Sequence, residues 1–370
     1  MTYVKIGTMF ENRLKSVREK LAKEKLDGVL ISSVANITYL TGYSNFFKEE
    51  RDGFVLITKD KNYILTHAIY SSSLSGKIPN FKVIEISRRD PPEKVIKNIL
   101  KNAYFLGIEE HNLTAYEYKK LLENFKILKN FDLKVKRSIK DKDEIELITK
   151  ACQVGDIAFE KVLKKIKLAV TEKQLAWELE NFIKEQGYDI SFRTIVAFGA
   201  NAAYPHHLSG QTKLENNQFV LLDFGVIFEN YCSDMTRTVF FGKPDNKQKK
   251  MYETVLVSQQ KAVEFINFSI KSGKKIMVSD VDKISRDYIV SQGFPSIPHS
   301  LGHGIGLEGH EHPHISQKSK ETLEEGMVFS VEPGIYIEGF GGVRIEDLFC
   351  ISKTVPIKQL TTSPKDLIGV

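Results

Sequence analysis

Four short segments in the second half of the sequence carry carboxylates and histidines at spacings that suit a metal centre. The first, residues 219–241, reads FVLLDFGVIFENYCSDMTRTVFF and contains Asp223 and Asp234. The turn-like dipeptide Glu229-Asn230 separates two apolar runs, which predicts a β-hairpin. With that dipeptide as the loop, Asp223 faces Thr236. The two aspartates are then diagonal neighbours on one face, about 7–8 Å apart at the backbone, and can converge on a cation.

The apolar setting of this hairpin favours metal binding over an ordinary polar surface. Two acids on the polar face of a hairpin would be the plainer interpretation of the pair alone. However, the run VLLDFGV is apolar on both sides of Asp223. A carboxylate in such a run is costly to bury unless it is paired or bound to a metal.

The other three segments add one imidazole and two carboxylates. Residues 298–316 read PHSLGHGIGLEGHEHPHIS and hold five of the nine histidines. Glycines flank His303 on both sides, so the backbone can pack closely and present the imidazole, a common ligand of divalent metals. Glu332 ends the apolar run GMVFSVE, and Glu346 lies in GGVRIED just after Arg344. The neighbouring histidines could bind a developing oxyanion.

The combined donor set predicts two metal ions rather than one. It consists of four carboxylates and one imidazole, with no thiolate: Asp223, Asp234, His303, Glu332 and Glu346. Oxygen-rich sets of this kind suit hard or borderline ions, with Mn²⁺ preferred and Co²⁺, Zn²⁺ or Fe²⁺ as alternatives. Five ligands are too many for one catalytic ion with an open position. Two ions roughly 3.5–4 Å apart would use them all and would activate a bridging hydroxide as the nucleophile.

The elements that must position these residues form two domains. Up to about residue 137, helical patterns at 11–26, 92–102 and 114–125 alternate with strand patterns at 28–33, 53–68, 81–87 and 104–110, which predicts an α/β domain. From residue 138 to 370, two pairs of long helices (about 143–166 and 172–187, then 247–271 and 278–291) are separated by strands. This pattern indicates an α+β catalytic domain.

Composition excludes several other classes of protein. The charge is +10 over residues 1–140 (26 − 16) and −4 over the remainder (27 − 31), but the lysines of the first part are scattered, so we expect no nucleic-acid partner. No apolar run reaches eighteen residues, so we expect no membrane span. Cys152, Cys232 and Cys350 form no disulfide or CxxC pattern. Together with the absence of a signal-peptide pattern, this favours the cytoplasm.

The four segments, in this order, resemble the pita-bread metallopeptidases, in particular the branch of Xaa-Pro aminopeptidases and Xaa-Pro dipeptidases (prolidases). The matching stretches are SFRTIVAFGANAAYPHH (191–207), LLDFGVIFENYCSDMTRTV (221–239), HSLGHGIGLEGHEHP (299–313) and EEGMVFSVEPGIYIEGFGGVRIED (324–347). NITYLTGY (36–43) is similar to the first domain of that branch. The resemblance implies a creatinase/prolidase-like α/β domain with a mixed sheet over residues 1–137 and a pita-bread catalytic domain over 138–370. It also implies a homodimer that acts on peptides with proline in the second position.

The resemblance further implies a role for each matching residue. The same five residues would be the ligands, and Glu332 would also transfer a proton. His206 and His310 would contact the substrate during catalysis, with His310 stabilising the tetrahedral intermediate. Other substrate contacts would come from His299, Phe192, Ile195, Arg344 and His314. Tyr336 and Arg344 would orient the ligand carboxylates.

Two departures from the family pattern bear on the substrate. His207 stands where many relatives have glycine, which crowds that loop. His314 stands where many have an arginine that can hold a substrate carboxylate. Because the permanent cation is missing at position 314, we favour an Xaa-Pro aminopeptidase, with a prolidase as the alternative. His314 itself or Arg344 could still hold a carboxylate.

More remote alternatives share parts of the pattern. A methionine aminopeptidase would lack the first domain, and a creatinase-like hydrolase would not need all five ligands. A non-catalytic binding module on this fold would be expected to have lost ligands, whereas this sequence keeps all five.

Overall fold

Strands and helices alternate through the first third of the chain and build a mixed six-stranded sheet. In the computed structural model, which describes residues 3–352 and 356–370, the sheet order is β4-β3-β2-β1-β5-β6. The strands are β1 (Gly28–Ile31), β2 (Gly53–Thr58), β3 (Asn62–Thr66), β4 (Lys82–Glu85), β5 (Phe105–Ile108) and β6 (Ile127–Asn130). The helices are α1 (Tyr3–Glu24), α2 (Val34–Thr41), α3 (Ala68–Leu74), α4 (Pro92–Ile99) and α5 (Ala115–Leu122).

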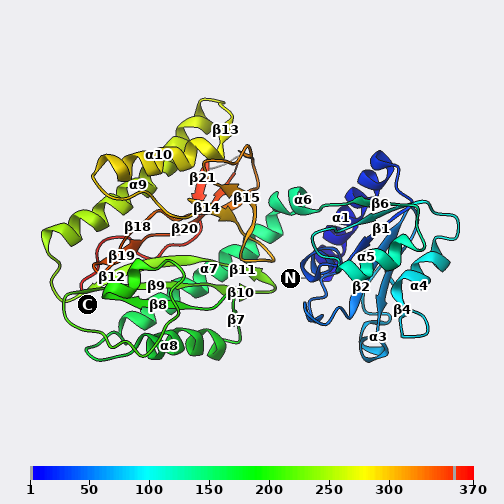
Figure 1. The fold of residues 1–370 in the computed structure, drawn as a ribbon, viewed down its shortest axis with the longest axis horizontal. Helices are drawn as coiled ribbons and strands as arrows, with labels where there is room; N and C mark the ends of the chain where they lie inside the picture. The colour runs from blue at the N-terminus through cyan, green and yellow to red at the C-terminus, as the bar shows by residue number, and fades with distance from the viewer. Residues whose placement is uncertain (1–2, 353–355) are drawn as a thin grey trace. The chain divides into compact units, whose positions relative to one another are not determined.

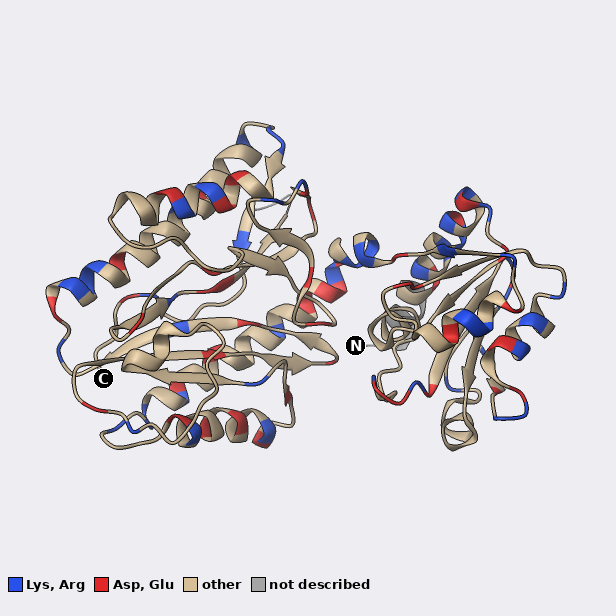
Figure 2. Cartoon of the chain, in the orientation of Figure 1, with Lys and Arg blue, Asp and Glu red and all other residues tan. Residues whose placement is uncertain are grey.

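The predicted α/β class is confirmed for this part, including its mixed sheet. β1, β2 and β3 pair antiparallel, while β4, β5 and β6 each join a neighbour in parallel. The elements α2, α3 and β6 were not predicted, since each is short and has no strong periodicity. Lysines and arginines are spread over the helices and loops here, as Figure 2 shows, in agreement with the scattered pattern of the sequence.

Contacts divide the chain into two units, with the break between Leu133 and Lys134. The predicted boundary after residue 137 stays a prediction; helix α6 (Lys134–Ser138) belongs by its contacts to the second unit. Within the described residues, no helix combines the length and the apolar character that crossing a membrane requires.

Two pairs of long helices frame the strands of the second unit (Figure 1). The first pair is α7 (Lys142–Leu163) and α8 (Glu172–Glu185); the second is α9 (Asn246–Lys271) and α10 (Val278–Ser291). Capping boxes fix where three of them begin: the side chains of Asp141, Thr171 and Asp245 each accept a hydrogen bond from the backbone three residues on. These helices match the predicted ranges within a few residues.

The strands between the helix pairs form several small sheets. One is β12-β9-β8 and another is β11-β10-β7, from β7 (Asp189–Ile190), β8 (Ile195–Phe198), β9 (Gln218–Phe224), β10 (Val226–Phe228), β11 (Tyr231–Cys232) and β12 (Met235–Phe241). The third is β15-β14-β17-β20-β21, from β14 (Gly302–Gly304), β15 (Glu311–Ile315), β17 (Val328–Val331), β20 (Asp347–Ile351) and β21 (Ile357–Gln359). Two further pairs are β18 (Gly334–Ile337) with β19 (Gly341–Arg344), and β13 (Ile276–Met277) with β16 (Thr322–Leu323).

Each helix pair packs on the strands through its own apolar cluster. Residues of α7 and α8, such as Phe159 and Leu179, share one cluster with Leu222 and Phe224 of β9. Residues of α9 and α10 share the other with the strands around Phe329. The strands are therefore buried on both faces, and polar side chains between them lie inside protein rather than in water. This arrangement places the site in the centre of the unit and confirms the α+β prediction.

Candidate active site

The predicted site residues converge on one cavity of about 390 Å³ in the second unit. Every one of them except Tyr336 lines this cavity: Phe192, Ile195, His206, Asp223, Asp234, His299, His303, His310, His314, Glu332, Arg344 and Glu346. They come from segments up to 154 residues apart (346 − 192), so only the fold brings them together. The volume is in the range of small-molecule binding sites.

The hairpin of β9 and β12 has the register that the sequence predicts. Asp223 pairs with Thr236, and at the outer end Phe228 pairs with Tyr231. The loop residues Glu229 and Asn230 have φ values of 47° and 72°. Positive φ at both loop residues gives the turn whose twist matches that of the two strands. The turn therefore sets the register, and the register brings the two aspartates to one end of the cavity.

Glycines place His303 where its imidazole reaches the carboxylates. A Cβ atom on Gly302 would lie 2.0 Å from the carbonyl oxygen of Ser330, and one on Gly304 would lie 2.0 Å from that of His312. Only glycine permits these approaches. His303 Nδ1 lies 3.0 Å from the carbonyl oxygen of Gly304. This contact assigns the proton to Nδ1 and leaves the lone pair of Nε2 facing the carboxylates.

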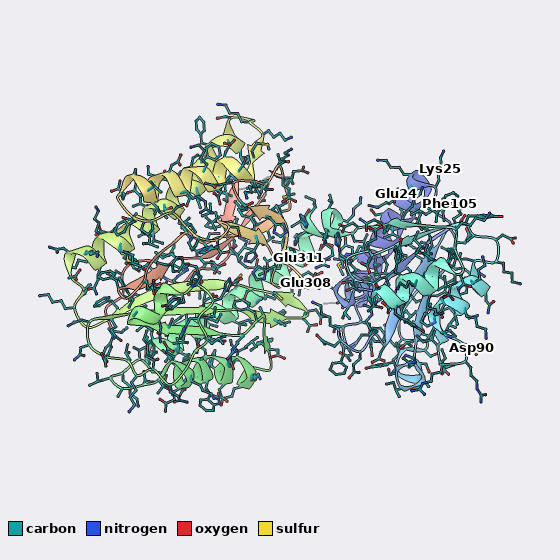
Figure 3. The ribbon with its side chains drawn as sticks, viewed as in Figure 1. Glu24, Lys25, Asp90, Phe105, Glu308 and Glu311 are labelled. Carbon is teal, nitrogen blue, oxygen red and sulfur yellow. The ribbon has the colours of Figure 1, made fainter. Side chains whose placement is uncertain are left out.

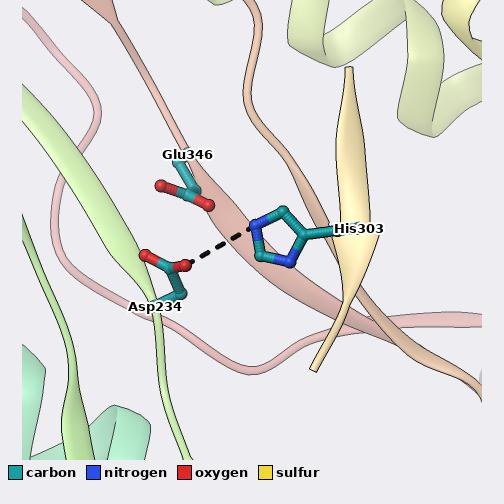
Figure 4. Close-up of side chains that lie close together, drawn as sticks. All are labelled: Asp234, His303 and Glu346. Atoms are coloured by element: carbon teal, nitrogen blue, oxygen red, sulfur yellow. Dashed lines mark ion pairs between the residues drawn. The ribbon is translucent and has the colours of Figure 1, made fainter. Parts of the chain in front are cut away.

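The imidazole and the carboxylates are close enough to share a cation. His303 Nε2 lies 3.3 Å from Glu332 Oε1 and 3.7 Å from Asp234 Oδ2. Figure 4 shows three side chains that point toward one another: His303 from β14, Asp234 from just before β12 and Glu346 from just before β20. One potential ligand atom from each of these three residues lies within 4.8 Å of the others. A single divalent ion could contact all three.

The carboxylates fit a divalent metal because their charges are otherwise poorly compensated. Asp223 Oδ1, Asp234 Oδ1 and Glu346 Oε1 are buried and have no hydrogen-bond partner among the described residues. Burial, with the charges of Glu346 and Asp223, raises the pKa of Asp234 well above its ordinary value. Burial, with repulsion from Glu332 and Asp223, raises the pKa of Glu346 to about 8. Unpaired oxygens and raised pKa values are expected of carboxylates that bind a cation.

His303 and Glu332 behave as a pair within this acidic cluster. Burial disfavours the imidazolium, but the hydrogen bond to Glu332 and the charges of Glu332 and Glu346 outweigh it and raise the pKa of His303 to about 9. Burial likewise opposes the Glu332 carboxylate, yet the hydrogen bond and charge of His303 lower the pKa of Glu332. This geometry suits a cation between Nε2 and the carboxylate, where a bound metal would displace a proton.

Arg344 connects two of the carboxylates to the wall of the cavity. Its guanidinium pairs with Asp223 Oδ2 and donates to Thr236 Oγ1 at 3.0 Å. Thr236 Oγ1 in turn lies 2.8 Å from Glu346 Oε2. Arg344 Nη1 also donates to Tyr336 Oη at 3.0 Å. All three sides of the guanidinium are thus engaged, and the arginine orients the predicted ligands directly and through the threonine.

Tyr336 connects Arg344 to His299, which lines the cavity. Tyr336 Oη lies 2.8 Å from His299 Nε2, while His299 Nδ1 lies 2.7 Å from the carbonyl oxygen of Ser300. The imidazole proton is thus on Nδ1, and the tyrosine donates to Nε2. Burial lowers the pKa of His299, in keeping with a neutral ring. Tyr336 does not line the cavity itself and contacts it only through Arg344 and His299.

The other predicted histidines lie on the open side of the site. The His310 ring centre is 4.1 Å from that of His303, and burial together with the charge of His303 lowers the pKa of His310. His206 is exposed on the cavity wall. His314 pairs with His303 across β14 and β15 and is also exposed. A neutral His310 next to the predicted ligands can donate a hydrogen bond from one ring nitrogen.

Glu172 is a buried carboxylate that the sequence did not reveal as part of the site. Its side chain is fully buried at the start of α8. Oε1 accepts hydrogen bonds from Phe198 N at 2.9 Å and Asn201 Nδ2 at 2.8 Å, and Oε2 accepts from Gly210 N at 3.0 Å. The fourth contact is His207 Nε2, 2.8 Å from Oε2. These contacts hold the segment that carries His206 onto α8.

A second buried ion cluster holds the segment that carries His310. Glu311 pairs with Arg137 and, at 3.1 Å, with Lys140; Arg137 also contacts Glu308 at 3.0 Å. Figure 3 labels Glu308 and Glu311 within the second unit. Although burial opposes its charge, these two cations lower the pKa of Glu311. No spacing in the sequence relates residues 137 and 311, so this cluster was not predictable.

Comparison with known proteins identifies the family. Residues 146–353 match the sequence model of Metallopeptidase family M24, and residues 13–138 match that of the Creatinase/Prolidase N-terminal domain. The chain belongs to metallopeptidase family M24. An uncharacterized peptidase of Staphylococcus aureus is 36% identical to it over 347 residues, which cover 90% of this chain and 95% of that protein.

Two solved structures are similar to this chain over nearly its whole length. An Xaa-Pro dipeptidase from Bacillus anthracis has a TM-score of 0.88 at 33% identity, covering 98% of this chain and 100% of that one. An X-Pro aminopeptidase from Thermotoga maritima has a TM-score of 0.84 at 29% identity, covering 96% and 99%. The predicted family and fold class are confirmed, and the M24 protein described here is a metal-dependent peptidase.

Proposed function

We propose that this M24 peptidase hydrolyses the bond before proline at the N-terminus of small peptides. The observation that carries the proposal is the convergence of all five predicted ligands on one cavity that also contains His206 and His310. The names of the two solved relatives, an Xaa-Pro dipeptidase and an X-Pro aminopeptidase, support proline specificity. They do not separate dipeptides from longer peptides.

The proposed ligands are Asp223, Asp234, His303, Glu332 and Glu346, for two divalent ions with Mn²⁺ preferred. When bound, these ions would supply an activated water and polarise the scissile carbonyl. The oxygen-rich donor set and the three unpartnered carboxylate oxygens fit such ions. Arg344 and Thr236 hold Asp223 and Glu346 in orientation, so these two ligands need little reorganisation on binding.

Two side chains are placed for proton transfer and oxyanion binding. Glu332 lies at the cavity wall, 3.3 Å from His303, and its carboxylate can take a proton there. The same carboxyl could then return that proton to the imino nitrogen of the leaving proline. His310 is exposed to the cavity and can donate a hydrogen bond to the carbonyl oxygen as its charge develops.

Proline selection follows from shape and from the missing amide hydrogen. The bond before proline is a tertiary amide, so a site for it needs no acceptor for an N–H group. Phe192 and Ile195 line the cavity and offer apolar surface for the ring. Ile195 is also the partner of Asp223 across β8 and β9, which places this surface beside a proposed ligand.

The decisive experiment compares peptides that differ only at the second residue. Mn²⁺-loaded protein should cleave Ala-Pro or Ala-Pro-Ala and leave Ala-Ala and Ala-Ala-Ala intact. Asp234→Ala should remove the activity, and Glu332→Gln should abolish turnover while circular dichroism shows an intact fold. Equal cleavage of the alanine peptides would overturn proline specificity. Near-wild-type turnover by Glu332→Gln would overturn the proton-transfer role.

We further propose that the protein is a homodimer, is located in the cytoplasm and has no nucleic-acid partner. Sedimentation of the purified protein tests the first.

A further inference from the structure

Arg193 is the one arginine of the second unit that has no partner among the described residues. Residues 134–370 contain five arginines. The other four are buried, and each pairs with a carboxylate: Arg137 with Glu311, Arg237 with Asp347, Arg286 with Asp282 and Arg344 with Asp223. Arg193 is exposed and lines the cavity of the active site. A permanent charge without a partner at a cavity wall is available to a ligand.

The two cations proposed from the sequence to hold a substrate carboxylate are less suitable. Arg344 already donates to Asp223, Tyr336 and Thr236, so all three of its nitrogens are engaged. His314 is a histidine, whose charge depends on pH, and is not a permanent cation at neutral pH. Arg193 is therefore the only permanently charged and unpaired cation among the described residues that line this cavity.

The proposed metal ligands and Arg193 lie in the same cavity but differ in exposure. Asp223, Asp234 and Glu346 are buried, whereas Arg193 lies at the exposed part of the lining. A dipeptide carries an ammonium at one end and a carboxylate at the other. With the scissile bond at the proposed metal ligands, its carboxylate would be attracted to the exposed cation.

The neighbours of Arg193 in the sequence fit the remaining part of such a substrate. Phe192 and Ile195, which flank it, line the same cavity and offer apolar surface to a proline ring. In a dipeptide ending in proline, the carboxylate is attached directly to a ring carbon. A cation for that carboxylate must therefore lie next to the surface that receives the ring. Strand β8 fixes this segment, since Ile195 pairs with Asp223.

We propose that Arg193 binds the C-terminal carboxylate of an Xaa-Pro dipeptide and makes dipeptides the preferred substrates. This inference rests on the proposed function and deepens it, because it selects the dipeptidase over the aminopeptidase that the sequence favoured. A planar guanidinium can hold both carboxylate oxygens at once, which a single histidine cannot do. In a longer peptide the same position holds an amide, which gains no ion pair with Arg193.

The test compares Ala-Pro with Ala-Pro amide, which differ only in the terminal charge, for Mn²⁺-loaded wild type and Arg193→Gln. Wild type should have the lower KM for Ala-Pro. Since hydrogen bonds to charged groups contribute about 1.5–3 kcal/mol, Arg193→Gln should raise the KM for Ala-Pro about 10- to 100-fold more than that for the amide. Arg193→Lys should recover part of the loss. Lys243→Gln removes an exposed charge that does not line the cavity and should match wild type.

Each alternative outcome has a distinct meaning. If Arg193→Gln affects Ala-Pro and the amide to the same extent, Arg193 does not bind the carboxylate. If His314→Gln shows the selective loss instead, the carboxylate holder is His314 and the inference is wrong. If wild type cleaves the amide or Ala-Pro-Ala better than Ala-Pro, the substrates are longer peptides; the inference then fails while the proposed function stands. Failure of wild type to cleave any proline peptide overturns both.

Discussion

His207 Nε2 lies 2.8 Å from Oε2 of Glu172, a carboxylate that is completely buried at the start of α8. The sequence suggested that a histidine in this position would crowd the loop. The structure shows that it instead provides a donor to a carboxylate that also binds Phe198, Asn201 and Gly210. Since His206 and Leu208 on either side line the cavity, this contact connects the fold of α8 to the wall of the active site.

Removing the His207 imidazole should therefore affect both stability and substrate binding. His207→Ala leaves a buried carboxylate with one donor fewer, which should cost about 1–3 kcal/mol in the free energy of unfolding. We expect the KM for Ala-Pro to rise more than kcat falls, because a loosened loop weakens substrate contacts. Urea unfolding and steady-state kinetics measure the two effects. His207→Gln keeps a donor and should recover much of the loss; unchanged stability of His207→Ala would show that the contact contributes nothing.

The metal-free protein should lose stability as the pH rises, because of Glu346. Its pKa is raised from 4.5 to about 8 in the folded state, so the folded protein holds this proton more tightly than the unfolded chain. The stability that this provides is present at pH 4.5 and is lost as the pH rises to about 8. Glu346→Gln does not titrate. Without metal at pH 8 it should be more stable than wild type, on the order of a few kcal/mol, and the difference should shrink toward pH 5.

Thermal unfolding from pH 5 to 8 in the presence of a chelator measures this difference. If the difference in Tm between Glu346→Gln and wild type does not depend on pH, the fold does not raise the pKa of Glu346.

Added metal should stabilise the folded state as long as the proposed ligands are intact. A ligand at 100 times its Kd stabilises a fold by about 2.7 kcal/mol, so saturating Mn²⁺ should raise the Tm by several degrees. Asp234→Asn removes a charge from the centre of the proposed ligand set and should abolish most of this shift. Asp287→Asn, which changes an exposed aspartate on α10, serves as the control. An equal Tm shift in Asp234→Asn and wild type would exclude Asp234 as a ligand.

Breaking the buried ion cluster at Glu311 should cost more than any surface substitution. Glu311→Gln removes the anion between two buried cations, Lys140 and Arg137, and leaves Arg137 paired with the more exposed Glu308. This change should destabilise the protein by about 3–5 kcal/mol. Because the pKa of Glu311 is lowered in the fold, its contribution is present above about pH 4.5 and is lost as the pH falls through the folded pKa. The difference in the free energy of unfolding between Glu311→Gln and wild type should therefore become smaller at low pH.

Glu308→Gln is the matched control for this cluster, since Glu308 contacts the same Arg137 but is 42% exposed. We expect Glu308→Gln to lower the free energy of unfolding by less than about 1 kcal/mol. Similar losses for both variants would show that burial does not set the strength of these pairs.

Local pattern was sufficient for the parts of the site that lie on one hairpin or one strand. The relation of Asp223 to Thr236 follows from the two-residue loop and the period of a strand, and the structure has that register. The same register could have indicated that Thr236, opposite Asp223, contacts residues of the site, as it does with Glu346 and Arg344. The position of His303 between two glycines likewise gave a correct expectation of close backbone contact.

Contacts between distant elements could not be predicted from the residues themselves. Glu172 is the first residue of α8, and nothing in its sequence setting indicates that its side chain faces the loop of the active site. Arg344 reaches Asp223 across 121 positions, and no pattern in either segment specifies that pairing. The family resemblance indicated Arg344 but could not show that all three of its nitrogens already have hydrogen-bond partners. Because Arg344 is occupied, Arg193 is the better candidate to bind a substrate carboxylate.

The glycines beside His303 also limit how this site can change over evolutionary time. Any side chain at position 302 or 304 would meet a backbone carbonyl oxygen at 2.0 Å, and backbone cannot move aside as a flexible side chain can. A lineage could therefore exchange residues on the exposed wall, such as Arg193 or His314, one at a time and acquire new substrates. We expect sequences descended from this one to diverge freely at that wall while the GHG triplet stays fixed, so that substrate choice changes without a change in the metal centre.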